Sequence, residues 1–104
     1  MDIVVEGGEL IFLSSKKNKK GRSKQKVSRG FWLSVRWDIS NAELLYLYEE
    51  CKFPAKGWIY TEIKRRWLEE KNGLLPEVLW RIFEIMPEPL YQLALDEMLE
   101  RGVV

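Results

Sequence analysis

The chain has 104 residues, of which 46% are apolar and 12% aromatic, with a formal net charge of +1. This length suits one domain with a modest core, and the apolar content is too high for a disordered chain. No apolar run approaches the roughly 20 residues of a membrane span, and the N-terminus lacks the pattern of a secretory signal. We therefore expect one cytoplasmic domain over residues 1–104 that does not enter a membrane.

Two residue types limit the chemistry. The sequence has no His and a single cysteine, Cys51. Without an imidazole there is no ordinary general base near neutral pH, and the usual triads and zinc sites are excluded. One cysteine cannot form an internal disulfide, and with no His to activate it we interpret Cys51 as a small core residue. The sequence therefore predicts a non-enzymatic protein without cofactor or metal.

The small net charge conceals an uneven distribution along the chain. Residues 1–37 hold nine Lys and Arg against three acids, a net charge of +6. Residues 38–104 hold eight Lys and Arg against thirteen acids, a net charge of −5. A polyanion is expected to meet the N-terminal third.

Residues 2–37 are expected to form a three-stranded antiparallel sheet. Apolar segments 2–6 and 9–13 flank Gly7-Gly8, and two glycines suit the positive φ angles of a tight hairpin turn. The third strand is predicted over 30–37, where alternation is typical of a half-buried strand. Its two faces would carry Phe31, Leu33, Val35 and Trp37 on the core side, and Trp32, Ser34 and Arg36 on the other.

Residues 40–102 are expected to be helical. Ser40 and Glu43 fit a capping box at the start of a first helix, which breaks at 53–57. Further helices are predicted over 58–71, 76–86 and 90–101, the last closed by Gly102. The fold class is therefore α+β, an N-terminal three-stranded antiparallel sheet with a long basic loop followed by three to four C-terminal helices.

Segment 16–29 forms the basic loop, in which eight of fourteen residues are Lys or Arg and none is acidic. Such like charge cannot enter a core, so the loop should be solvated and meet an anion. Flexible basic arms contact phosphates in many nucleic-acid-binding proteins, although charge runs also serve solubility or protect a sheet edge. The predicted contacts are Lys16, Lys17, Lys19, Lys20, Arg22, Lys24, Lys26 and Arg29.

Trp32 and Arg36 extend this hypothesis to the third strand. On the strand face opposite the core, an indole beside a guanidinium could stack a base of DNA or RNA. The alternative is that Trp32 is covered by a helix or by the first hairpin.

Three weaker patterns lie in the helical part. Glu62-Ile63-Lys64 has the acid-x-Lys spacing of metal-dependent nucleases, with Asp38 as an upstream carboxylate, but a helix would separate the two side chains. Lys64-Arg65-Arg66 is interpreted as solvated, with pairs to Glu69 and Glu70. The helices predicted before residue 53 and over 58–71 match a helix-turn-helix only weakly, because the connection over 53–57 is longer than the usual turn.

The last two helices are apolar around much of their circumference. Either the helix over 76–86 is enclosed by the others, or an apolar strip remains for a homodimer or a protein partner. The sequence thus predicts a small nucleic-acid-binding module, for example a regulator or accessory factor. The alternative is an adaptor or inhibitor that docks on a nucleic-acid enzyme through its acidic and apolar helical part.

Overall fold

The computed structural model describes residues 3–18 and 21–104, and the side chains of residues 3–13 and 23–104. The chain forms a three-stranded antiparallel sheet followed by five helices, so the predicted α+β class is confirmed. It divides into two compact units, Met1–Glu62 and Ile63–Val104. The single domain expected over 1–104 stays a prediction.

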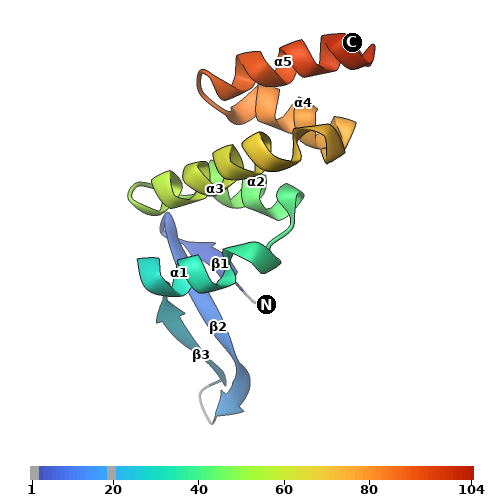
Figure 1. Cartoon of the computed structure of the whole chain (residues 1–104). Coiled ribbons are helices and arrows are strands. Elements are labelled where there is room, and N and C mark those ends of the chain that lie inside the picture. The colour runs from blue at the N-terminus through green and yellow to red at the C-terminus, as the bar shows by residue number, and fades with distance from the viewer. Residues whose placement is uncertain (1–2, 19–20) are drawn as a thin grey trace. The chain divides into compact units, whose positions relative to one another are not determined.

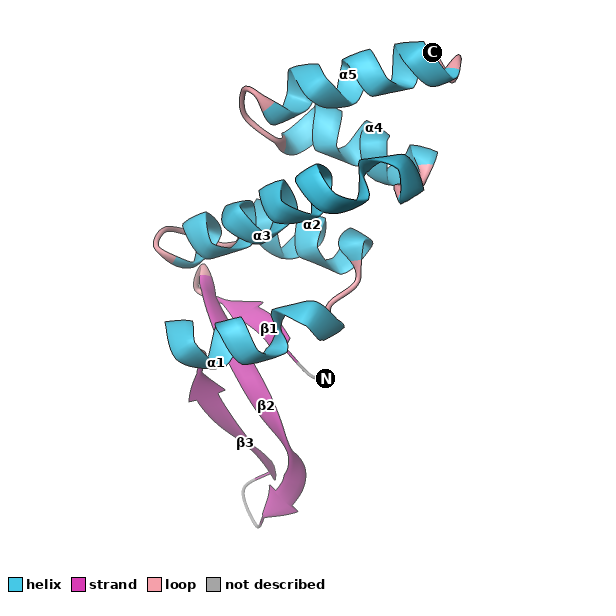
Figure 2. Cartoon of the chain, viewed as in Figure 1, coloured by secondary structure: helices cyan, strands magenta, loops and turns pink. Residues whose placement is uncertain are grey.

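The sheet has the strand order β1 (Ile3–Glu6), β2 (Glu9–Asn18) and β3 (Gly21–Lys26), as Figure 2 shows. The predicted hairpin between β1 and β2 is confirmed. Its turn requires positive φ angles, which are 60° at Gly7 and 82° at Gly8, and glycine adopts these angles without a steric penalty. The carbonyl of Gly8 also accepts a 2.8 Å hydrogen bond from the backbone N–H of Lys52.

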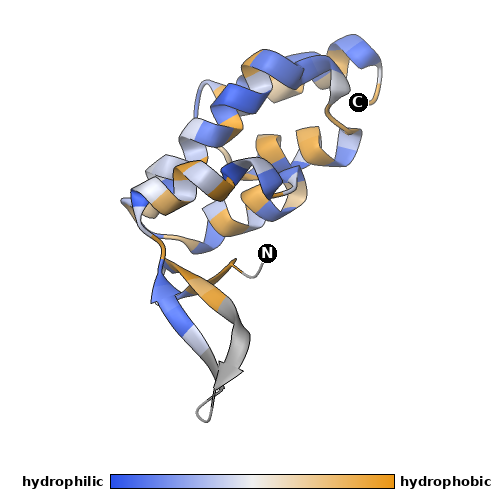
Figure 3. Ribbon diagram, turned by 60° about the horizontal axis from the view of Figure 1, so that its bottom comes forward, coloured by the Kyte–Doolittle hydropathy of each residue, from blue (hydrophilic) through white to orange (hydrophobic). Residues whose placement is uncertain are grey.

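The third strand is β3 rather than 30–37, so the position predicted for it is wrong. Segment 16–29, expected as a loop, contributes strand residues to both β2 and β3. In Arg22–Lys26 basic residues alternate with Ser23 and Gln25, a period of two that a search for apolar alternation overlooks. Figure 3 shows the contrast between hydrophilic β3 and the apolar part of β2.

The β2–β3 register contains an irregularity. Leu13 lies opposite Lys24 and Lys17 opposite Arg22, so β2 advances four residues while β3 advances two. Extra residues in one strand form a bulge, which bends the strand and increases its twist. The β2–β3 pairing beyond Leu13 therefore has a different register from the pairing between Ile11 and Leu13.

The segment predicted as a strand over 30–37 is instead helix α1 (Arg29–Val35), followed by a short 3-10 helix over Arg36–Asp38. Ser28 caps α1, because its hydroxyl accepts a 3.1 Å hydrogen bond from the N–H of Phe31. Trp32, Val35 and Ile39 are buried, and their spacing of three and four residues is helical. The Phe31 ring contacts Phe12 of β2 at a centroid distance of 5.1 Å, which places α1 against the sheet (Figure 1).

The first unit also contains α2 (Asn41–Glu50) and the first half of α3 (Ala55–Glu70). The predicted cap at Ser40 is confirmed, since its hydroxyl accepts a 3.2 Å hydrogen bond from the N–H of Glu43. The helix predicted over 58–71 is confirmed as α3, which begins three residues earlier than expected. The core of this unit is lined by buried side chains that include Ile3, Leu10, Val27, Trp32, Leu44, Leu47 and Ile59.

The second unit contains the rest of α3, a 3-10 helix over Lys71–Gly73, α4 (Pro76–Ile85) and α5 (Leu90–Arg101). The last two helices are confirmed close to their predicted bounds. Gly102 ends α5 at φ 76°, the left-handed conformation expected of a helix-terminating glycine.

Helices α4 and α5 contact one another along their length, and Val78, Leu79 and Ile82 are buried. Leu75, just before α4, and Trp80, in the middle of the helix, are exposed. Helix α4 is therefore not fully enclosed, and a protein partner or second copy at the C-terminal helices stays a prediction.

Candidate nucleic-acid interface

The predicted phosphate contacts fall partly outside the described side chains. This applies to Lys16, Lys17, Lys19, Lys20 and Arg22. The backbone of Lys16 and Lys17 continues β2, and that of Arg22 lies in β3. The roles of these five residues stay predictions.

Lys24 and Lys26 lie in the described part of β3 and pair with two carboxylates of the sheet. Nζ of Lys24 is 2.9 Å from Oε1 of Glu6 on β1, and Nζ of Lys26 is 3.1 Å from Oε1 of Glu9 on β2. All four side chains are exposed, and such pairs contribute only about 0–1 kcal/mol. The cations at the base of the hairpin are thus partly neutralised by the chain's own carboxylates, although the sequence predicted a solvated basic loop that meets an external anion. A phosphate could compete for them.

Arg29 and Arg36 differ in their surroundings. Arg29 is exposed at the start of α1 and has no carboxylate partner within the described part of the chain. Arg36 is half-buried, with Nε 3.6 Å from Oε1 of buried Glu62 and its guanidinium carbon 4.5 Å from the ring centroid of Trp37. Of the two, Arg29 is therefore the more accessible to an anion.

Trp32 is not available for stacking. Its side chain is 1% exposed, which agrees with the alternative that Trp32 is covered by the rest of the fold. The reason is the helical conformation of α1, which turns Trp32 towards the core on the same face as Val35 instead of onto a solvated strand face. A base cannot reach the Trp32 ring without unfolding this unit.

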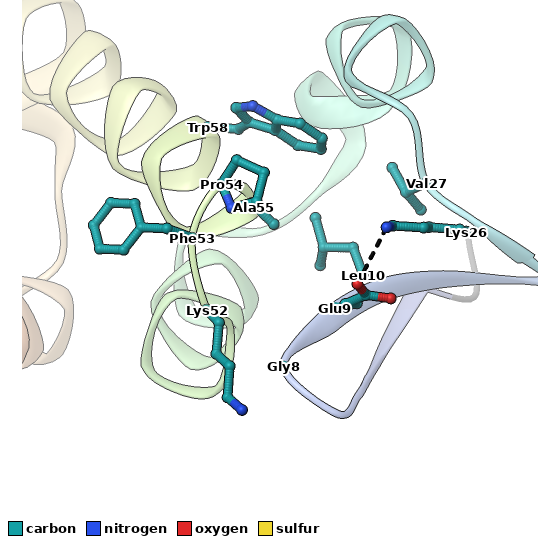
Figure 4. A pocket seen from close by; sticks show the side chains of 10 residues that line it. All are labelled: Gly8, Glu9, Leu10, Lys26, Val27, Lys52, Phe53, Pro54, Ala55 and Trp58. Carbon is teal, nitrogen blue, oxygen red and sulfur yellow. Dashed lines mark ion pairs between the residues drawn. The ribbon is translucent and has the colours of Figure 1, made fainter.

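The sequence-based search missed a pocket beside the Gly8 turn (Figure 4). Phe53 and Trp58 line it together with Lys26 and Lys52, and the cavity has a volume of about 50 Å³. Phe53 is 75% exposed, which is unusual for so large an apolar ring. Its position immediately before a proline, in the break between two helices, is the sequence signal that could have indicated a surface aromatic residue.

Trp58 also lines a second pocket of about 50 Å³ in the same unit, with Arg29, Arg36 and Thr61. The hydroxyl of Thr61 donates a 3.0 Å hydrogen bond to the carbonyl of Gly57 one turn earlier in α3. The half-buried Trp58 thus borders both pockets. Lysines line the first and arginines the second.

Cys51 is buried, as expected of a core residue. Burial raises the pKa of its thiol to about 11, although the nearby Lys56 ammonium acts in the opposite direction. A thiol with this pKa is almost entirely protonated at neutral pH and is a poor nucleophile.

The acid-x-Lys pattern of Glu62 and Lys64 lies on α3. Side chains two residues apart point in different directions on a helix, and Glu62 is buried while Lys64 is exposed. Over the residues described, no three Asp, Glu, Cys or His side chains gather as a metal site would require. The nuclease-like spacing therefore does not bring the side chains of Glu62 and Lys64 together in one site.

The basic cluster on α3 agrees only in part with its interpretation as solvated. Arg65 forms the expected ion pair with Glu69. Arg66, however, is 8% exposed and thus buried. The cluster does not form a continuous cationic surface, because its three members lie in different environments.

Comparisons with models of protein families, with curated proteins and with solved structures found no match to this chain. Among the helices in the described ranges, none has both the length and the apolar character needed to cross a membrane.

Proposed function

We propose that the protein is a small non-enzymatic module that binds nucleic acid through phosphate contacts from residues 14–26, here named the basic arm. One observation carries the proposal. Among the residues that the structure describes, β1 pairs with β2 from Glu9 to Phe12, whereas β2 and β3 remain paired as far as Asn18 and Gly21. The arm thus continues as a ribbon of β2 and β3 beyond the end of β1.

The composition of the arm supports this proposal. It contains seven Lys and Arg residues and no acid. An antiparallel two-stranded ribbon has dimensions that fit the major groove of B-DNA. Neutralised phosphates release condensed counterions, which gives such an arm affinity without sequence preference.

Charge balance indicates which part of the arm would bind. Only three acids occur in residues 1–37, and two of them, Glu6 and Glu9, pair with Lys24 and Lys26 at its base. Asp2 is the third and lies outside the described residues. The end of the arm near Lys19 therefore has the greatest excess of positive charge along the sequence.

The test is a fluorescence anisotropy titration of labelled oligonucleotides at several salt concentrations. Four to six phosphate contacts predict a log–log slope of about −3 to −5 for affinity against salt. Changing Lys16, Lys17, Lys19 and Lys20 to Glu should abolish the binding. Absence of binding by the wild-type protein at low salt would contradict the proposal.

A matched charge control uses the double variant Lys16→Glu/Lys17→Glu beside Lys64→Glu/Arg81→Glu. Both change the net charge equally, but the second pair lies in the other unit. Equal loss of affinity in both would indicate a general effect of net charge instead of a basic arm. The alternative hypothesis, docking of the acidic helices on a nucleic-acid enzyme, predicts that none of these arm changes affects partner binding.

We further propose that the module acts in the cytoplasm as a regulator or accessory factor of nucleic-acid metabolism. The single cysteine agrees with a reducing compartment.

A further inference from the structure

We propose that Arg29 and Arg36 form a pocket between α1 and α3 that receives the terminal phosphate of a nucleic-acid strand. This inference deepens the proposed function and rests on it. The basic arm contacts phosphates along a strand, whereas this pocket holds the phosphate at the end of the strand. It gives the two arginines a common role, although the surroundings of their guanidinium groups differ.

The pocket lies between one side of α1 and one side of α3, within the first unit. Six residues line it, four from α1 and the position just after it and two from α3, namely Arg29, Trp32, Leu33, Arg36, Trp58 and Thr61. Arg29, Leu33 and Arg36 are spaced by four and three residues, which places them on one side of a helix. The two arginines therefore border one pocket from positions two turns apart.

The residues that line the pocket carry positive charge. Of the six in the described part of the chain, the two arginines are charged and none is acidic. Arg36 is held by buried Glu62 and by the ring of Trp37, and Glu62 offsets part of its charge. Arg29 is exposed and has no carboxylate partner among the described residues. Guanidinium groups bind phosphate oxygens through paired hydrogen bonds, so two of them at one pocket suit a phosphate.

The size of the pocket favours a phosphate over a base. Its volume is about 50 Å³, whereas a water molecule takes up roughly 30 Å³ of the liquid and a cavity that encloses benzene measures roughly 150 Å³. The pocket therefore admits a group of a few non-hydrogen atoms and excludes a nucleobase. A phosphate within a strand must leave room for a nucleoside on each side, whereas a terminal phosphate needs that room on one side only.

The charge of a terminal phosphate also suits the pocket. A phosphate monoester carries a charge of about −1.5 to −2 at neutral pH and has three acceptor oxygens. A phosphate within a strand carries a single negative charge. Two guanidinium groups can each contact a separate oxygen of the monoester, so the pocket should prefer the end of a strand to its interior.

The basic arm ends near the pocket. Lys26, the last residue of β3, is three residues before Arg29. Trp58 lines this pocket and also the pocket that contains Lys26. The ring of Phe31 in α1 contacts Phe12 of β2, which holds α1 on the sheet from which the arm extends. A strand that contacts the arm as far as Lys26 is therefore near enough for its end to enter the pocket.

The experiment measures the fluorescence anisotropy of an oligothymidylate labelled at an internal base, with a 5′-phosphate, a 3′-phosphate or no terminal phosphate. Wild type should bind at least one phosphorylated strand about fivefold or more tightly than the unmodified strand, because charge-assisted hydrogen bonds to the end group are added. Arg29→Gln should abolish this preference. The end that gives the preference identifies the source of the phosphate.

The matched control for charge is Lys24→Gln, which removes an exposed cation of the arm that does not line the pocket. It should weaken binding of all three strands alike. Thr61→Leu is a second test, because it places a larger apolar side chain at the pocket without a change of charge. It should remove the preference and leave binding of the unmodified strand as in wild type. Arg36 is kept, because it also pairs with buried Glu62 and its loss would lower stability.

A titration with thymidine 5′-monophosphate tests the pocket without a strand along the arm. In nuclear magnetic resonance spectra, the indole signals of Trp58 should shift with the nucleotide and not with thymidine, because Trp58 lines the pocket. Arg29→Gln should suppress this shift, and Lys24→Gln should not.

Three results would overturn the inference. They are equal affinity of wild type for all three strands, equal loss of the preference in Arg29→Gln and Lys24→Gln, and unchanged Trp58 signals with the nucleotide. Binding of all strands without a preference would overturn the terminal-phosphate pocket and leave the proposed function standing. If wild type binds none of the strands at low salt, the proposed function itself fails, and a shift of Trp58 with the nucleotide would then support the phosphate pocket alone.

Discussion

Two sets of cations, one in each unit of the chain, have different surroundings. In the second unit, the Arg101 guanidinium donates to Glu97 at 3.0 Å and to the carbonyls of Leu74 and Lys71 at 2.6 and 2.7 Å. In the first unit, the described lysines of β3 form exposed pairs with Glu6 and Glu9 at the sheet surface. Arg101 thus fixes tertiary contacts within the second unit, whereas Lys24 and Lys26 lie on the surface of the first.

This difference shows why net charge alone says little about function. A cation that is half-buried and bonded to several acceptors cannot leave them for an external anion without a loss of stability. A cation in a solvated pair can exchange its partner at small free-energy change. The contrast therefore predicts where substitutions will affect the fold and where they will affect binding.

The largest effect on stability is expected from Trp32→Ala in the first unit. The side chain is almost fully buried, and removal of a buried Trp leaves a cavity that lowers the free energy of unfolding by about 3–5 kcal/mol. Chemical denaturation followed by circular dichroism measures this change. Trp37→Ala is the control, since its ring is 56% exposed. Its loss should be about 1 kcal/mol, the order of its cation–π contact with Arg36.

The contrast between Trp32 and Trp37 tests the helical assignment of α1 directly. On the strand predicted from sequence, Trp37 would be the core residue and Trp32 the solvated one. A larger loss in Trp37→Ala than in Trp32→Ala would therefore restore the strand interpretation.

Arg101→Met is expected to lower the free energy of unfolding by about 2–3 kcal/mol. The change leaves two carbonyls and the buried Glu97 without their strongest donor, and Lys71, 3.8 Å from Glu97, compensates only in part. Urea denaturation provides the measurement. Lys24→Met removes an exposed ion pair of the first unit and should change stability by less than about 1 kcal/mol. Similar losses in both variants would contradict the distinction between the bonded Arg101 and the exposed Lys24.

Local signals in the sequence predicted much of the fold. The Gly7-Gly8 turn, the Ser40 cap, Pro76 and Gly102 each act through the backbone of a few residues. Such signals are independent of tertiary context. They located one hairpin and the three helices α2, α4 and α5 with errors of a few residues.

The segment 16–37 was predicted less well for two physical reasons. The segment from Phe31 to Trp37 has the apolar alternation of a strand. The structure adopts a helix there instead, because helical spacing brings Trp32, Val35 and Ile39 together in the core. Residues 16–18 and 21–26 form strands although their sequence contains no apolar side chain, so their pairing depends on backbone hydrogen bonds that composition does not reveal.

The candidate site was predictable only in its charge. The basic arm is evident from residue counts, but the pocket of Phe53 and Trp58 depends on the approach of the Gly8 turn to residue 52. That contact joins positions more than forty residues apart, and no local pattern encodes it. Trp32 was selected from the aromatic residues because the strand assignment was wrong.

The smallest of these effects is expected from Ser28→Ala at the start of α1. The hydroxyl accepts the N–H of Phe31, and loss of an N-cap lowers helix stability by about 1 kcal/mol. Ser34→Ala is the matched control, because that hydroxyl donates to a carbonyl one turn earlier in the helix and should change stability by less than about 0.5 kcal/mol. If α1 is held in place mainly by burial of Trp32 and Val35, Ser28→Ala will lower the unfolding midpoint without altering the helical circular dichroism of the native state. Loss of helical signal before unfolding would show instead that the cap decides between helix and strand in a segment whose apolar pattern permits both.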